Sequence, residues 1–85
     1  MKELIELIKQ HKEDFADSVV RRMNTSTANK SRHVNVLGAL YMDDWDLLEE
    51  LLQDSWYRKP LDGVIICMNC DFEVKSLFIT AYKKL

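Results

Sequence analysis

The sequence predicts an all-α domain, and three observations support this prediction. Apolar residues recur at helical spacing along most of the chain. Asp stands at several positions where a helix would begin, and the 85 residues include only two Gly and one Pro. A chain of this length suits a single domain, residues 1–85. We expect four to five short helices: a long N-terminal helix followed by two stacked helical hairpins.

The first expected helix covers about residues 2–23. Its apolar side chains fall on one broad side and its charged side chains on the other. The polar tract 24–29 then ends the helix, because short hydroxyl and amide side chains compete for backbone hydrogen bonds. The apolar side contains Leu4, Ile5, Leu7, Ile8, Phe15, Ala16, Val19 and Met23.

The next two helices form the first expected hairpin. An apolar helix passes through residues 34–41, and an amphipathic helix follows over residues 45–56. Asp43 or Asp44 is placed to cap the second of these helices, whose N-terminus also favours acidic side chains. Pro60 ends the unit, because the residue before a proline is disfavoured in helical conformation.

The last quarter has two interpretations. Residues 63–82 contain many β-branched and aromatic side chains, which indicates a C-terminal β-hairpin and an α+β fold as the alternative. We favour helices, with Asp62 capping a short fourth helix and Asp71 capping the last one. The expected apolar face of the last helix contains Val74, Leu77, Phe78, Ala81 and Leu85.

A faint internal repeat favours the helical interpretation. An offset of 27 residues aligns Asp44-Trp45-Asp46-Leu47 with Asp71-Phe72-Glu73-Val74. Residues 34–84 resemble the helix-turn-helix half of ankyrin repeats, although the Thr-Pro-Leu-His signature is absent and Asp43 and Cys70 replace the turn Gly. This resemblance implies stacked helical hairpins and a binding role rather than a catalytic one.

Charge is unevenly distributed along the chain. The net charge of −2 and the pI of about 5.6 give no global attraction to nucleic acid or anionic lipid. A basic block without acids, residues 18–42, adjoins an acidic block without bases, residues 43–54. The two blocks either neutralise each other across neighbouring helices or provide a surface for a partner.

The acidic block is our preferred binding surface, because concentrated charge can steer the encounter with a basic protein. By analogy of size and charge, such a chain suits a small inhibitor or modulator of the phage anti-host, DNA-mimic, immunity or antitoxin type. The predicted partner-binding residues are Asp43, Asp44, Asp46, Glu49, Glu50 and Asp54.

The basic block gives the alternative function, a small DNA-binding transcriptional regulator. Basic and hydroxyl side chains at the start of a helix can contact phosphates, as in helix-turn-helix proteins. The residues predicted for this function are Arg21, Arg22, Lys30, Arg32 and His33.

The segment Cys67-Met68-Asn69-Cys70 has three interpretations. The cysteines could be small buried hydrophobes, a redox pair, or half of a metal site that His33 and His11 complete. We expect buried hydrophobes, because no βαβ pattern precedes the pair and the histidines lack zinc-finger spacing. The prediction is therefore no metal and no cofactor.

Motifs for catalysis and for membranes are absent from the sequence. It contains no Gly-rich phosphate loop, no Gly-x-Ser-x-Gly and no His-Glu-x-x-His. No apolar run approaches the roughly 18 residues of a membrane span, and the N-terminus does not resemble a signal peptide. We expect a non-enzymatic, cytoplasmic protein that binds another protein, with homodimerisation left open.

Overall fold

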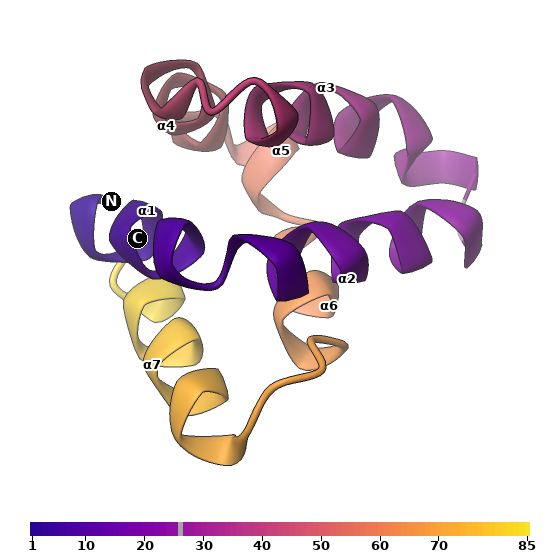
Figure 1. Ribbon diagram of the computed structural model, residues 1–85. Coiled ribbons are helices and arrows are strands. Elements are labelled where there is room, and N and C mark those ends of the chain that lie inside the picture. The colour runs from indigo at the N-terminus through magenta and orange to yellow at the C-terminus, as the bar shows by residue number, and fades with distance from the viewer. Residues whose placement is uncertain (26) are drawn as a thin grey trace.

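The computed structural model describes residues 1–25 and 27–85, which form helices and no strands (Figure 1). The all-α prediction is confirmed, and residues 63–82 contain two helices joined by a turn at 67–71 rather than a β-hairpin. Ser26, part of the polar tract expected to end the first helix, lies outside the described residues. The elements are α1 (Lys2–Gln10), α2 (Lys12–Thr25), the 3-10 turn η1 (Thr27–Asn29), α3 (Lys30–Tyr41), α4 (Trp45–Gln53), α5 (Ser55–Arg58), α6 (Leu61–Ile66) and α7 (Phe72–Lys83).

The expected long N-terminal helix is divided at His11. Helical hydrogen bonds continue on both sides: the His11 N–H donates to the Leu7 carbonyl at 3.0 Å, and the Phe15 N–H donates to the His11 carbonyl at 3.0 Å. The chain changes direction between them (Figure 1). This division lets α1 pack against α4 and α7 while α2 packs against α3 and α6. Tertiary packing therefore overrides a periodicity that is continuous in the sequence.

The helix expected over residues 45–56 is also divided, at Asp54. The Asp54 carboxylate accepts a hydrogen bond from the Trp56 N–H at 2.9 Å, and its own backbone is extended. Asp favours such caps over helix interiors, because its short side chain competes for backbone donors. The structure therefore has more and shorter helical segments than we expected.

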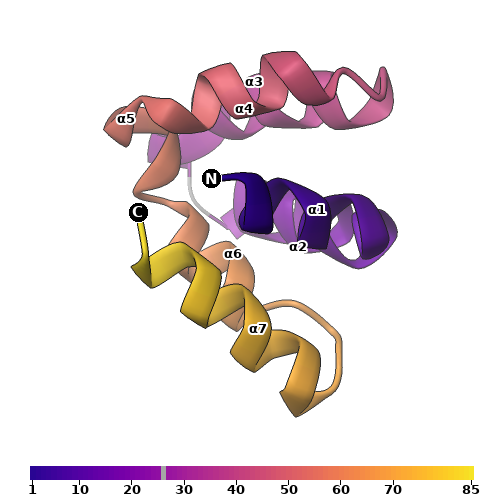
Figure 2. The same cartoon turned by 90° about the vertical axis from the view of Figure 1, so that its left-hand side faces the viewer.

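The helices form three layers, with α1 and α2 in the middle (Figures 1 and 2). On one side α3 packs against α4, and on the other α6 packs against α7, so both expected hairpins form. The expectation that they stack on each other is corrected. Within the described residues neither α3 nor α4 packs against α6 or α7, because α1 and α2 lie between them, and α5 makes the connection to α6.

Large apolar side chains from all three layers meet in the core. Phe15 of α2 stacks against Phe78 of α7, with ring centroids 6.2 Å apart. This core fixes which faces of α1, α4 and α7 point to solvent. None of the described helices is both long enough and apolar enough to cross a bilayer. The largest fully buried apolar side chains are Leu4, Ile8, Phe15, Leu40, Leu48, Leu52, Leu61, Ile65 and Phe78.

Helices α4 and α7 begin in the same way, at positions related by the 27-residue offset. Asp44 accepts a hydrogen bond from the Leu47 N–H at 3.1 Å, and Asp71 accepts one from the Val74 N–H at 3.0 Å. Each carboxylate satisfies a backbone donor that has no partner within its helix. The expected cap at Asp62 is wrong. Helix α6 begins at Leu61, so Asp62 lies within the first turn of the helix and not before it.

Candidate protein-binding surface

Helix α4 carries three carboxylates on the side opposite to its buried residues. Leu48 and Leu52 are fully buried, four residues apart on one face. Asp46 and Glu50 are exposed on the other face, with Glu49 half-buried at its edge. No ion pair joins these three to another residue in the part of the chain that the structure describes. We call Asp46, Glu49 and Glu50 the α4 acidic surface.

The other three predicted acidic residues shape helix ends. Asp44 and Asp54 accept hydrogen bonds from the first turns of α4 and α5. Asp43 has a left-handed backbone, with φ at 52°, and follows Met42, the C-cap residue of α3. Its carboxylate accepts a hydrogen bond from the Lys12 ammonium at 2.7 Å, tying the turn to α2. The six predicted residues therefore divide into three that organise the chain and three that face solvent.

Two lysines of α1 lie beside the α4 acidic surface. A hollow of about 280 Å³ between α1 and α4 is lined by Lys2 and Lys9 on one side and by Asp46 and Glu49 on the other. The Lys9 ammonium lies 5.7 Å from the Trp45 ring centroid, a cation–π contact, and 3.4 Å from the Glu6 carboxylate. The negative charge of the α4 acidic surface is therefore partly neutralised by lysines on the side that faces α1.

The two arginines at the end of α2 contact the α6–α7 layer. Arg21 pairs with Asp17 at 2.6 Å and donates a hydrogen bond to the Cys67 carbonyl. The Arg22 guanidinium lies directly over Gly63 of α6, since a Cβ on that glycine would be 2.9 Å from a guanidinium nitrogen. Both residues therefore connect α2, in the middle layer, to the layer formed by α6 and α7.

The remaining predicted basic residues belong to α3. The Arg32 guanidinium stacks on Trp56, 4.6 Å from its ring centroid. His33 is only 2% exposed, and burial, assisted by the charges of Arg22 and Arg32, lowers the pKa of its imidazole. Lys30 is exposed in the first turn of α3. Four of the five predicted basic residues are thus buried or contact other parts of the chain, and Lys30 is exposed.

The cysteines and histidines do not assemble into one site. Cys67 is exposed and Cys70 is half-buried, so the expectation that both are buried hydrophobes is wrong for Cys67, which ends α6. His11 lies at the α1–α2 junction with its ring edge toward Phe78, and His33 is buried in α3. Across the described residues, no group of three or more His, Cys, Asp or Glu side chains is arranged to hold a metal ion.

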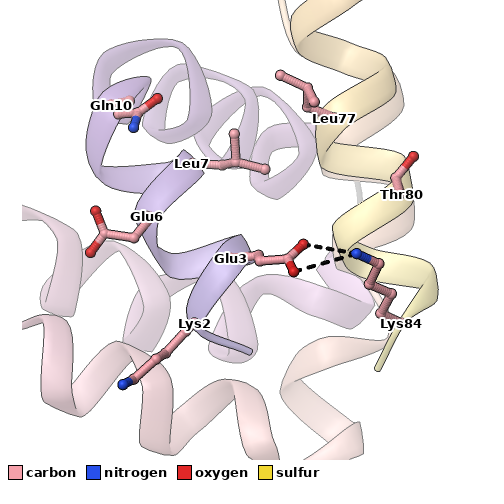
Figure 3. Close-up of a pocket in the computed structure, with 8 residues that line it drawn as sticks. All are labelled: Lys2, Glu3, Glu6, Leu7, Gln10, Leu77, Thr80 and Lys84. Carbon is pink, nitrogen blue, oxygen red and sulfur yellow. Dashed lines mark hydrogen bonds and ion pairs between the residues drawn. The ribbon is translucent and has the colours of Figure 1, made fainter.

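Sequence reasoning missed an apolar groove between α1 and α7. The groove has a volume of about 500 Å³, and Figure 3 shows Leu7 and Leu77 facing each other across it. Leu77 was expected in the apolar face of the last helix, yet it is 55% exposed. Its position at the edge of that face was the available signal. The polar rim consists of Lys2, Glu3, Glu6, Gln10, Thr80 and Lys84.

These features define a small helical chain with two candidate surfaces on either side of α1: an acidic one on α4 and an apolar groove against α7. Comparison of the chain with protein-family models, with curated proteins and with solved structures finds no match.

Proposed function

We propose that this chain is a non-catalytic protein-binding module whose α4 acidic surface binds a basic surface on another protein. The observation that carries the proposal is the position of Asp46, Glu49 and Glu50. All three lie on a helix whose opposite face is fixed in the core, so their carboxylates are presented on a rigid support. Surface charge held in this way accelerates encounter and selects against acidic partners.

Inhibition or modulation of the bound protein is the role we favour, of the phage anti-host, DNA-mimic, immunity or antitoxin type. Such a role needs a folded surface of defined charge and no reaction centre. The DNA-binding alternative has less support, because a duplex would require arginines that already contact Cys67, Gly63 and Trp56.

Charge reversal on α4 tests the proposal. Partners are first captured from cell extract by the unmodified chain and identified. The purified partner is then titrated against the triple variant Asp46→Lys, Glu49→Lys, Glu50→Lys at two salt concentrations. We expect binding to weaken about tenfold or more and to lose most of its salt dependence. The matched control reverses three exposed acids elsewhere: Glu13→Lys, Asp62→Lys and Glu73→Lys.

Equal binding by the two triple variants would contradict the proposal. The DNA-binding alternative is tested in parallel with duplex DNA and the variant Arg21→Ala, Arg22→Ala, Arg32→Ala. Salt-dependent duplex binding that only the arginine variant loses would establish that alternative instead.

A further inference from the structure

We infer that the groove between α1 and α7 binds an amphipathic helix of the partner, with its apolar stripe between Leu7 and Leu77 and a basic flank over the α4 acidic surface. This inference rests on the proposed function, because it names the partner segment that the acidic surface would meet. Helix-in-groove binding is a common recognition mode in which regularly spaced apolar side chains fill a hydrophobic groove.

The shape of the groove suits such a segment. Its walls are two helices from opposite ends of the chain, and a leucine from each lies at its centre (Figure 3). Leu77 is 55% exposed on a helix whose neighbouring Phe78 is fully buried. Covering the exposed part of this leucine removes apolar surface from water, which is favourable. The groove therefore offers a docked side chain apolar contact on both walls.

Among the described residues, three of the four charged side chains of the rim are already paired, and Lys2 is the exception. Lys84 lies 3.1 Å from Glu3 across one end of the groove, and Lys9 lies 3.4 Å from Glu6 on α1. Each pair neutralises its own stretch of rim. The groove itself therefore selects for apolar side chains, and the net charge that a docked helix meets is set by Lys2 and by side chains beyond the rim.

That net charge is negative and comes from α4. The groove and the α1–α4 hollow share two lining residues, Lys2 and Glu6, so only the ridge of α1 separates them. A helix in the groove has one flank directed across this ridge. There it faces two carboxylates of the α4 acidic surface, those of Asp46 and Glu49, against the single unpaired ammonium of Lys2. Charge complementarity among the described residues thus requires a basic flank.

Two synthetic helical peptides test the inference. Both carry leucines at positions i, i+3, i+4 and i+7; one has lysines on the flank and the other has glutamates there. Binding is measured by fluorescence anisotropy and located by NMR shifts of the leucine methyl groups. We expect the lysine peptide to bind, the glutamate peptide to bind at least about tenfold more weakly, and the methyl groups of Leu7 and Leu77 to shift.

A matched pair of variants on α7 distinguishes docking in the groove from non-specific binding to exposed apolar side chains. Leu77→Gln removes the apolar wall with a good helix former at an exposed position, so the fold should persist. We expect it to weaken binding of the lysine peptide about tenfold. Phe72→Gln changes a more exposed apolar residue of the same helix outside the groove, and it should leave binding within about twofold.

The outcomes distinguish failure of the inference from failure of the proposed function. Shifts confined to α4, or equal binding by the two α7 variants, would overturn the inference while leaving the acidic surface as the binding site. Absence of binding by the lysine peptide would also overturn it, and the partner titration would still test the function separately. A wild-type dimer that Leu77→Gln dissociates in sedimentation would assign the groove to a second copy of this chain and overturn the inference.

Discussion

The hairpins α3–α4 and α6–α7 have related sequences, yet their second helices meet different surroundings. Both second helices begin with an aspartate that accepts a hydrogen bond from the N–H three residues later. In the first hairpin the next residue, Trp45, is half-buried against α1. In the second hairpin the corresponding Phe72 is 82% exposed. The same local signal therefore produces the same cap, and a third element decides whether the aromatic residue is buried.

The turns of the two hairpins also differ. The first turn is short, and Asp43 occupies its left-handed position. There the Asp43 and Asp44 N–H groups donate to the Leu40 and Ala39 carbonyls at 3.1 and 2.9 Å, an arrangement typical of a Schellman motif. The second turn is longer, residues 67–71, and the described chain contains no other non-glycine residue with positive φ. Five measurements test this contrast.

Truncation of the two aromatic residues should give the largest difference. Trp45→Ala should lower the free energy of unfolding by about 2 kcal/mol, somewhat less than a fully buried Trp, because the ring is half-buried. Phe72→Ala should change it by less than about 0.5 kcal/mol. Urea unfolding followed by circular dichroism measures both values. A Phe72→Ala cost equal to that of Trp45→Ala would show that the second hairpin buries this residue after all.

The pH dependence of stability should differ between the hairpins. His33 of the first hairpin has a pKa lowered below its ordinary value of 6.5, mainly by burial. The unfolded chain therefore binds a proton that the folded chain excludes, so stability is full above that value and is lost as the pH falls below it. The slope is at most about 1.4 kcal/mol per pH unit for one proton. His33→Gln should flatten this decline of stability at acid pH, measured by urea unfolding at a series of pH values.

Groups of the second hairpin should cause the loss of stability at alkaline pH. Burial raises the pKa of the Cys70 thiol above 9.0 and that of the Tyr82 phenol above 10.0. Both groups stay protonated in the folded chain while the unfolded chain loses protons, so stability falls as the pH rises through this range. Urea unfolding of the double variant Cys70→Ser, Tyr82→Phe tests this between pH 9 and 11. Its free energy of unfolding should fall less steeply with rising pH than that of the wild type. An equally steep fall would contradict this assignment.

Removal of either aspartate cap should cost the same amount. Asp44→Ala and Asp71→Ala should each lower the free energy of unfolding by about 1 kcal/mol, because each leaves a helix N–H without its side-chain acceptor. The asparagine variants at these positions should retain most of the stability. A large difference between the two alanine variants, measured by thermal unfolding, would show that the 27-residue correspondence is superficial.

The left-handed turn residue should give the smallest effect. Asp43→Gly relieves the strain of a positive φ, worth roughly 0.5–1 kcal/mol, and removes an exposed ion pair with Lys12 worth up to about 1 kcal/mol. We expect a net change of less than about 0.5 kcal/mol. Asp43→Asn keeps the preference for this backbone and loses only the ion pair, so it isolates the second contribution.

Local features of the fold were predictable from the sequence, and the arrangement of the layers was not. Helical periodicity and the caps at Asp44 and Asp71 depend on neighbouring residues, which the sequence displays directly. The break at His11 and the insertion of α1 and α2 between the hairpins depend on contacts between distant segments. No periodicity within residues 2–23 records those contacts.

The candidate site was predictable in the same partial way. The carboxylates of Asp46, Glu49 and Glu50 follow from the helical face opposite Leu48 and Leu52. The acidic residues at helix ends could have been distinguished from these three in the sequence. A carboxylate at a capping position accepts a hydrogen bond from the backbone and is not free for a partner. The groove could not have been predicted, because Leu7 and Leu77 meet only once α1 and α7 are packed together.

The central position of α1 and α2 also governs how the molecule opens. Apart from the α5–α6 connection and the hydrogen bond that the Tyr82 hydroxyl of α7 donates to the Arg58 carbonyl of α5, the two outer layers of the described chain pack against this middle layer. Release of α1 and α2 would uncover the inner faces of both hairpins together, so amide protons on opposite sides of the protein should exchange through one common opening. A partner held on α1 would therefore slow hydrogen exchange in helices that it never touches.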